Sequence, residues 1–234
     1  MSTIARKSVL ITGANGNLGS AVTKSLLDKD YFVVATVAEE SMVNELGDHE
    51  HLRVKVVNLA HEKDSENLVH RVISQYGKVD AALLLVGGFA MGSIRETSGS
   101  DIKKQFELNF ETAYYTTRTL FQHMMENNSG RIVFIGSRPA LVPSQGKNVL
   151  AYALSKSLLF RLAECLNEEA RGKNVSVTVI VPSTLDTPQN RKSMPDTDPS
   201  NWVKPTDLAE ILEFVINERG APLRETILKV YNNS

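Results

Sequence analysis

Short apolar runs alternate with longer amphipathic segments along most of the chain. Residues 18–27, 101–125 and 150–171 repeat apolar side chains three and four positions apart, which is the period of a helix with one buried face. Strands that alternate with helices form parallel sheets covered on both faces, so the pattern predicts an α/β, doubly wound parallel sheet. The predicted strands are residues 8–12, 31–37, 52–59, 79–86, 131–135 and 175–181, with 226–231 as an edge strand.

The chain has 234 residues, of which 42% are hydrophobic and 23% are charged, so it can bury one full core. We therefore expect a single domain over residues 1–234. Residues 183–205 are rich in Pro, Asp and Ser and form the longest irregular stretch. Because loops of this length inside a compact domain are often functional, we predict that they form a lid over a substrate.

The charge balance argues against nucleic acid and membranes as binding partners, and the cysteine content bears on the cellular compartment. Lys and Arg number 26 against 27 Asp and Glu, and no basic block is present to bind nucleic acid or an anionic membrane surface. One cysteine, Cys165, and the lack of a signal-peptide pattern in residues 1–7 favour a reducing, cytoplasmic environment.

Cys165 shares a helix side with Leu158, Leu162 and Leu166, which predicts a core position. The five His residues lack metal-ligand spacing, so no metal site is expected.

A glycine-rich turn follows the first predicted strand and opens the first predicted helix. Gly13 suits a tight turn, Gly16 lets the backbone approach a pyrophosphate, and Gly19 permits close helix packing. The N–H groups at the start of the helix would face the anion. The alternative is an ordinary glycine-rich loop, but the position at the start of a βαβ unit favours dinucleotide binding. The predicted contacts are Gly13, Asn15, Gly16, Asn17, Leu18 and Gly19.

A tyrosine and a lysine lie four residues apart near the start of the predicted helix 150–171. Tyr152 and Lys156 therefore share one helix face, where the ammonium would favour phenolate and lower the pKa of the tyrosine. A tyrosine of this kind can act as a general acid for a carbonyl that is being reduced. The alternative is a half-buried tyrosine beside a lysine whose stem packs on apolar surface.

Together, the glycine turn and the Tyr–Lys pair resemble the short-chain dehydrogenases and reductases, and the resemblance covers essentially the whole chain. It implies a Rossmann-type domain that moves a hydride between a nicotinamide dinucleotide and a small substrate. It also implies that Tyr152 handles the proton, that Lys156 also holds the nicotinamide ribose, and that Ser137 orients the substrate oxygen. Asn109 would complete a proton relay.

The resemblance extends to further cofactor contacts and to the assembly. It implies a homodimer or homotetramer that pairs through residues 101–125 and 150–171. The chain departs from the family pattern at Val86, at Gly87, at Asn58 and at Ser183, which follows Pro182 where the family has glycine. The implied contacts are Val37, Glu39, Asn58, Leu59, Val86, Gly87, Gly88, Tyr152, Lys156, Pro182 and Thr187.

The choice of cofactor depends on the end of the second predicted strand. An acidic residue there hydrogen-bonds the adenosine ribose and repels a 2′-phosphate. Val37 takes the aligned position and Glu39 follows it, while residues 14–18 and 37–40 contain no Lys or Arg. This arrangement favours NAD(H) and leaves NADP(H) open, because Glu39 and Glu40 can also be solvated residues at the start of a helix.

Residues 78–81, 87–90 and above all 184–195, with Trp202 beyond them, resemble the dihydropteridine reductases of this family. The substrate is therefore a dihydropterin or an ordinary ketone or aldehyde. Asn190 to Lys192 either contact the substrate or are solvated lid residues, and Trp202 either covers the substrate or anchors the lid. A dinucleotide-sensing regulator without turnover is the alternative from another class, and the retained Tyr152, Lys156, Ser137 and Asn109 argue against it.

Overall fold

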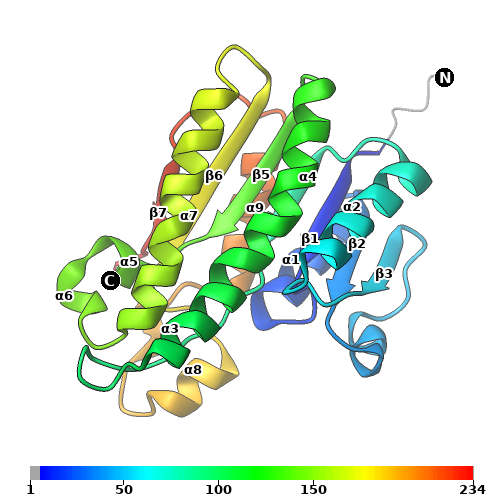
Figure 1. The fold of residues 1–234 in the computed structure, drawn as a ribbon. Helices are drawn as coiled ribbons and strands as arrows, with labels where there is room; N and C mark the ends of the chain where they lie inside the picture. The colour runs from blue at the N-terminus through cyan, green and yellow to red at the C-terminus, as the bar shows by residue number, and fades with distance from the viewer. Residues whose placement is uncertain (1–5, 234) are drawn as a thin grey trace.

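The computed structural model describes residues 6–233. Residues 1–5 and 234 lie outside the described part, and with them most of the segment in which we find no signal-peptide pattern. Seven parallel strands form one sheet in the order β3-β2-β1-β4-β5-β6-β7 (Figure 1). They are β1 (Ser8–Thr12), β2 (Phe32–Val37), β3 (Leu52–Val56), β4 (Ala81–Leu84), β5 (Gly130–Ile135), β6 (Val175–Pro182) and β7 (Ile227–Val230).

The order of the strands reverses at the centre of the sheet. β1 pairs with β2 on one side and with β4 on the other, so Leu10 lies between Val34 and Ala82. The segments that follow the two central strands therefore leave in opposite directions at the carboxyl ends of the strands, which is where ligands bind in open α/β sheets. The predicted doubly wound, Rossmann-type α/β sheet is confirmed, with β7 as its edge strand.

Helices cover both faces of the sheet (Figure 1). Strand side chains alternate between the two layers: Leu10 belongs to the core shared with α2, α4 and α7, whereas Val9 and Ile11 belong to the core shared with α1 and α9. The helices are α1 (Asn17–Asp28), η1 (Glu40–Leu46), α2 (Glu62–Tyr76), α3 (Gly99–Phe106), η2 (Glu107–Glu111), α4 (Thr112–Glu126), α5 (Arg138–Leu141), α6 (Pro143–Gly146), α7 (Leu150–Glu169), α8 (Pro188–Ser193), η3 (Pro199–Asn201) and α9 (Pro205–Ile216).

Three elements differ most from their predicted extents. β4 ends at Leu84 because the Leu85 N–H donates to the side-chain oxygen of Thr12 (3.0 Å) instead of to the backbone of a neighbouring strand. β3 ends at Val56, and the chain then turns at Asn58, whose side-chain oxygen accepts the Ala60 N–H (3.1 Å). The predicted helix 101–125 is broken into α3 and α4 by η2, a π-helical turn. The apolar spacing of three and four residues does not distinguish such a turn from continuous α-helix.

The irregular segment 183–205 contains α8 and η3, so it is more ordered than the sequence predicts. The Thr187 hydroxyl caps α8 by accepting the Asn190 N–H (3.1 Å). Leu185 and Val203 form a parallel bridge that joins the two ends of the segment. Trp202 is buried, and its carbonyl accepts a hydrogen bond from Asn232 (2.9 Å). These contacts favour the anchoring role for Trp202.

Cys165 is exposed on α7, so its predicted core position is wrong. The buried stripe of α7 runs through Leu159, Phe160 and Ala163, whereas Leu162 and Leu166 are only partly buried at its margin. The sequence pattern shows which side of a helix is apolar, but the width of the buried stripe depends on the layer beneath it.

A buried carboxylate ties α9 to the chain between α1 and β2. Glu213 accepts hydrogen bonds from the Tyr31 hydroxyl and from Asn217, both at 2.9 Å. Lys29 and Arg219 lie 3.5 and 3.4 Å from the same carboxylate. Burial alone would raise the pKa of Glu213, but Asn217, Tyr31 and Lys29 outweigh burial and lower it. Glu213 is therefore ionised, and its hydrogen bonds hold α9 against the chain between α1 and β2.

Candidate active site

The glycine turn between β1 and α1 is compact. Gly13 has a φ of 66°, in the left-handed region that favours glycine. A Cβ on Gly19 would overlap the Gly13 carbonyl oxygen and lie 2.8 Å from Cα of Ala14. Both positions therefore require glycine, as the sequence predicts, although Gly19 packs against the turn itself rather than against the strand.

The first turn of α1 carries features of an anion site. Gly16 occupies the N-cap position without a capping side chain, and the turn formed by Asn17, Leu18 and Gly19 contains no acidic residue. The first N–H groups of a helix have no partner inside the helix, and the helix dipole favours negative charge there. The turn and the helix terminus therefore fit the diphosphate of a dinucleotide.

Lys156 is buried on α7, with 5% of its surface exposed. Its ammonium donates a hydrogen bond to the carbonyl of Ile135 at the end of β5 (2.9 Å), which is one of the three bonds it can donate. Burial lowers the pKa of Lys156 from 10.5 to about 8. The Lys156 ammonium is therefore held at the carboxyl edge of the sheet and has further N–H groups with which to donate hydrogen bonds.

Tyr152 lies one helical turn before Lys156, and burial raises its pKa. The expectation that Lys156 lowers the pKa of Tyr152 is wrong for the protein without a bound cofactor. The cost of burying a phenolate is the largest effect on this pKa. Ser137 lies close enough to Tyr152 to oppose the effect of burial. The Ser137 Oγ is buried, and among the described residues it has no hydrogen-bond partner of ordinary geometry.

Asn109 lies in the π-helical turn η2 and is fully buried. Its side chain accepts the Gly88 N–H (2.9 Å) and donates to the Gly88 carbonyl (3.0 Å). The same amide nitrogen lies within hydrogen-bond distance of the side-chain oxygens of Gln105 (2.9 Å) and Ser155 (3.1 Å), so its two N–H groups are shared among three acceptors. The Ser155 hydroxyl donates to the carbonyl of Tyr152 (2.9 Å). Asn109 thus links the segment after β4 to the helix that carries Tyr152.

The segment after β4 approaches Lys156 closely. A Cβ on Gly87 would lie 2.9 Å from the Lys156 ammonium and 2.7 Å from the Asn109 side-chain oxygen. A Cβ on Gly13 would lie 3.2 Å from Val86, so the first and fourth strands end side by side. The structure therefore brings Val86, Gly87 and Gly88 between the glycine turn and the Tyr–Lys pair.

The adenosine end of the predicted site lies beyond β2 and β3. Val37 is buried at the end of β2, and Glu39 occupies the N-cap position of η1. Asn15 donates from the glycine turn to the carboxylate of Glu45 (3.1 Å), near the end of η1. Asn58 follows β3, and the next residue, Leu59, is buried in the core.

The predicted lid, residues 183–205, follows β6. Pro182 ends β6, and Thr187 is buried where it caps α8. Asn190 donates to the Leu185 carbonyl (2.9 Å), and Arg191 pairs with Asp186 (2.6 Å). These contacts lie within the lid itself.

A family model described as short chain dehydrogenase matches residues 7–198. The chain belongs to this family. It is an oxidoreductase that uses a nicotinamide dinucleotide and acts on a small molecule.

The chain is similar to family members along nearly its whole length. It is 25% identical over 232 residues to a dihydropteridine reductase of Dictyostelium discoideum, with 97% of this chain and 96% of that protein covered. It is 24% identical over 231 residues to an acetoacetyl-CoA reductase of Acinetobacter sp. strain RA3849, with 92% of each chain covered. The structure of ElxO with NADP bound has the same fold, with a TM-score of 0.88 at 20% identity and 97% of each chain covered.

Several side chains that contact the predicted site residues are not among those predicted. Phe89 lies edge-on to Tyr152, with 5.1 Å between ring centroids. Ser155 and Gln105 complete the Asn109 network, and Glu45 lies beside the glycine turn. Ser155 stands three positions after Tyr152 and Gln105 four positions before Asn109, so helical spacing could have found both. The contacts of Phe89 with Tyr152 and of Glu45 with Asn15 join segments far apart in the sequence.

Neither a metal centre nor a membrane segment is found in the part of the chain that the structure describes. Within residues 6–233, no group of three or more His, Cys, Asp or Glu side chains is placed to hold a metal ion. No helix in that range is both long and apolar enough to span a bilayer.

Proposed function

We propose that the protein reduces a small carbonyl or dihydropterin substrate, with Tyr152 as the proton donor. The observation that carries the proposal is the meeting of Tyr152, Ser137 and Lys156 at the carboxyl edge of the sheet, next to the glycine turn. The buried Ser137 hydroxyl can donate to a substrate oxygen. Lys156 has further N–H groups with which to hold ribose hydroxyls.

The proposed reaction balances one hydride and one proton. The reduced nicotinamide ring, when bound, supplies the hydride to the carbon of a C=O or C=N bond. Tyr152 gives its phenolic proton to the oxygen or nitrogen of that bond, and the Lys156 ammonium stabilises the phenolate that remains. Since burial raises the pKa of Tyr152 in the protein alone, the phenol stays protonated and ready to act as an acid.

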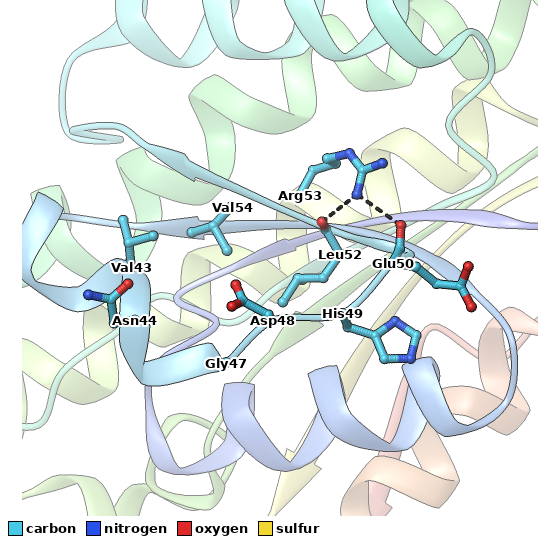
Figure 2. A pocket seen from close by; sticks show the side chains of 9 residues that line it. All are labelled: Val43, Asn44, Gly47, Asp48, His49, Glu50, Leu52, Arg53 and Val54. Carbon is cyan, nitrogen blue, oxygen red and sulfur yellow. Dashed lines mark hydrogen bonds between the residues drawn. The ribbon is translucent and has the colours of Figure 1, made fainter.

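Two carboxylates support a preference for NAD(H). Asn15 holds Glu45 beside the glycine turn, and Glu39 occupies the N-cap position of η1. On the neighbouring β3, the Arg53 guanidinium donates to the carbonyls of Glu50 and Leu52 (2.9 and 2.7 Å), so it is turned to its own main chain (Figure 2). A 2′-phosphate would therefore meet negative charge on this side of the site without a cation to balance it.

Fluorescence titration with NADH and NADPH tests this preference. Like charges brought together in a binding site cost on the order of 1 kcal/mol or more, so we expect NADPH to bind at least about fivefold more weakly. Glu45→Gln should narrow the difference, whereas Glu40→Gln, an exposed acid of the same helix, should leave it unchanged. Equal affinities in the unmodified protein would contradict the preference.

Replacement of Tyr152 by Phe tests the proton donor. We expect turnover to fall by at least about a hundredfold, the usual contribution of general acid catalysis, while NADH affinity is retained. Turnover should be measured with NADH and NADPH on a dihydropterin and on a panel of ketones and aldehydes. Normal turnover of Tyr152→Phe with any of these substrates would contradict the assignment.

The lid and the assembly complete the proposal. Residues 183–205 close over the substrate, held at their two ends by the bridge between Leu185 and Val203. Two copies pair through the helices α3, α4 and α7, on which Tyr114 and Leu154 are exposed apolar residues. Light scattering should give the mass of a dimer or tetramer, and a monomer at micromolar concentration would contradict the pairing.

A further inference from the structure

Three large apolar side chains project from one loop beside the proposed proton donor. Phe89, Met91 and Ile94 are 61%, 74% and 77% exposed, and all lie between β4 and α3. Their exposure exceeds that of the other large apolar side chains that face solvent in the described chain, Tyr114, Leu154 and Phe214. Burying such side chains is favourable, so a cluster of them beside a reaction site requires an explanation.

Hydrogen bonds hold this loop in place. The Gly92 N–H donates to the Asn148 carbonyl (2.8 Å), and the Leu150 N–H donates to the Gly92 carbonyl (2.9 Å). Gly92 thus forms a parallel bridge with Val149 at the start of α7, three residues before Tyr152. The backbone between Met91 and Ile94 is therefore anchored to the start of the helix that carries Tyr152.

The second half of the loop is fixed as well. The Ser93 N–H and hydroxyl both donate to the Glu96 carboxylate (2.9 and 2.8 Å). The Thr97 hydroxyl donates to the Ser93 carbonyl (2.8 Å), and Ser98 and Asp101 form the capping box of α3. Because the backbone is held along its length, the exposed side chains cannot turn inward by refolding the loop.

Phe89 connects this loop to the chemistry. Its ring lies 5.1 Å from that of Tyr152 at an interplanar angle of 68°, an edge-on contact. A molecule whose C=O or C=N group receives the proton of Tyr152 must therefore pass beside Phe89. Most of the ring remains exposed and can pack on that molecule.

The part of the loop next to Tyr152 lacks charge. Residues 85–94, which include Phe89, Met91 and Ile94, contain no Asp, Glu, Lys, Arg or His. The charged residues of the loop, Arg95 and Glu96, follow at its far end, and Glu96 is bound to Ser93. In the lid, Arg191 is paired with Asp186 at 2.6 Å. An anionic group on the substrate would find no counter-charge along residues 85–94, whereas an apolar ring would gain contact area.

We propose that Phe89, Met91 and Ile94 form an apolar wall that selects an uncharged substrate with a planar apolar or aromatic group next to the reacting C=O or C=N bond. This inference rests on the proposed function and names the substrate class of the same site. Phe89 packs on the planar group, and Met91 and Ile94 cover its outer part. The wall therefore disfavours short anionic ketones.

The test compares three probes on matched variants. The probes are phenylacetone, a dihydropterin, and acetoacetate as a short anionic ketone. We expect Phe89→Ala to lose about tenfold in kcat/KM on the two ring-bearing probes, the size of an aromatic contact, and little on acetoacetate. Phe89→Trp should retain the preference, and Phe214→Ala, which removes an exposed ring on α9, should change none of the three values.

A binding measurement keeps the test independent of turnover. Phenylacetone binding to the NADH complex should be detected by ligand-observed NMR for the unmodified protein and weakened about tenfold in Phe89→Ala. Absence of phenylacetone binding to the unmodified protein, equal losses on all three probes, or a preference for acetoacetate would overturn the wall. If Met91→Gln with Ile94→Gln dissociates an oligomer and leaves all three kcat/KM values unchanged, the loop is a subunit contact and the proposal is wrong. Normal turnover of Tyr152→Phe would instead contradict the proposed function.

Discussion

The buried charge of Lys156 should make the protein less stable than a variant without it. The ammonium is 5% exposed, has no carboxylate partner among the described residues, and has a pKa lowered by burial from 10.5 to about 8. That difference corresponds to about 3 kcal/mol of free energy by which the fold disfavours the charged form. The Lys156→Met variant removes the charge and keeps an unbranched apolar side chain in its place.

The gain is offset in part by the hydrogen bond to the Ile135 carbonyl, whose loss costs about 1 kcal/mol. We therefore expect Lys156→Met to raise the free energy of unfolding by about 2 kcal/mol at pH 7, while it abolishes turnover. For a chain of this length the midpoint of thermal unfolding should rise by about 4–8 °C.

The pH dependence identifies the cause. Between pH 8 and 10.5 the unfolded chain binds the proton at Lys156 more tightly than the folded chain does, so the stability of the unmodified protein rises with pH in this window. The penalty is fully present below pH 8 and disappears by about pH 10.5, where the two proteins should differ least. Urea titrations at pH 7 and pH 10 measure this difference.

An exposed lysine provides the control. Lys173→Met, in the turn after α7, should change stability little at either pH. A Lys156→Met variant that is less stable than the unmodified protein at pH 7, or a difference that does not change with pH, would refute the reasoning.

Three further changes test the fold around the site. Glu213→Ala should lower the free energy of unfolding in urea by about 3 kcal/mol because it leaves the buried Tyr31 hydroxyl unpaired. Because the pKa of Glu213 is lowered in the folded protein, this loss should shrink as the pH falls below 4.5. An effect no larger than that of the exposed control Glu210→Gln would contradict the prediction. Gly19→Ala should abolish NADH binding because its Cβ overlaps the Gly13 carbonyl, and retained affinity would show that the turn can shift. Ser98→Ala should destabilise α3 by about 1 kcal/mol in the same unfolding assay, and an unchanged midpoint would show that the capping box contributes nothing.

Much of the fold could be predicted because it depends on local pattern. The β-branched runs and the amphipathic period identify the strands and the three longest predicted helical segments, and their alternation requires parallel pairing. The glycine turn could also be predicted from the sequence, since Gly13 needs a left-handed backbone and Gly19 has no room for a side chain. Both requirements act within seven consecutive residues, 13–19.

Features that depend on packing were missed or misjudged. The Cys165 side chain is exposed because the buried stripe of α7 is narrower than its apolar side. The π-helical turn at Asn109 follows from contacts with Gly88 and Ser155, which are remote in sequence. Both errors arise where another layer, rather than the segment itself, decides the geometry.

The sequence by itself determined which groups are present: a glycine turn that can accept a diphosphate, a Tyr–Lys pair on one helix face, and a charge-free run after the fourth strand. The tertiary structure alone decided their electrostatics and neighbours. A pKa depends on how much water and charge surround a group, so only the packed fold could make Lys156 a weakened base held by Ile135, keep Tyr152 protonated, and set Phe89 against its ring.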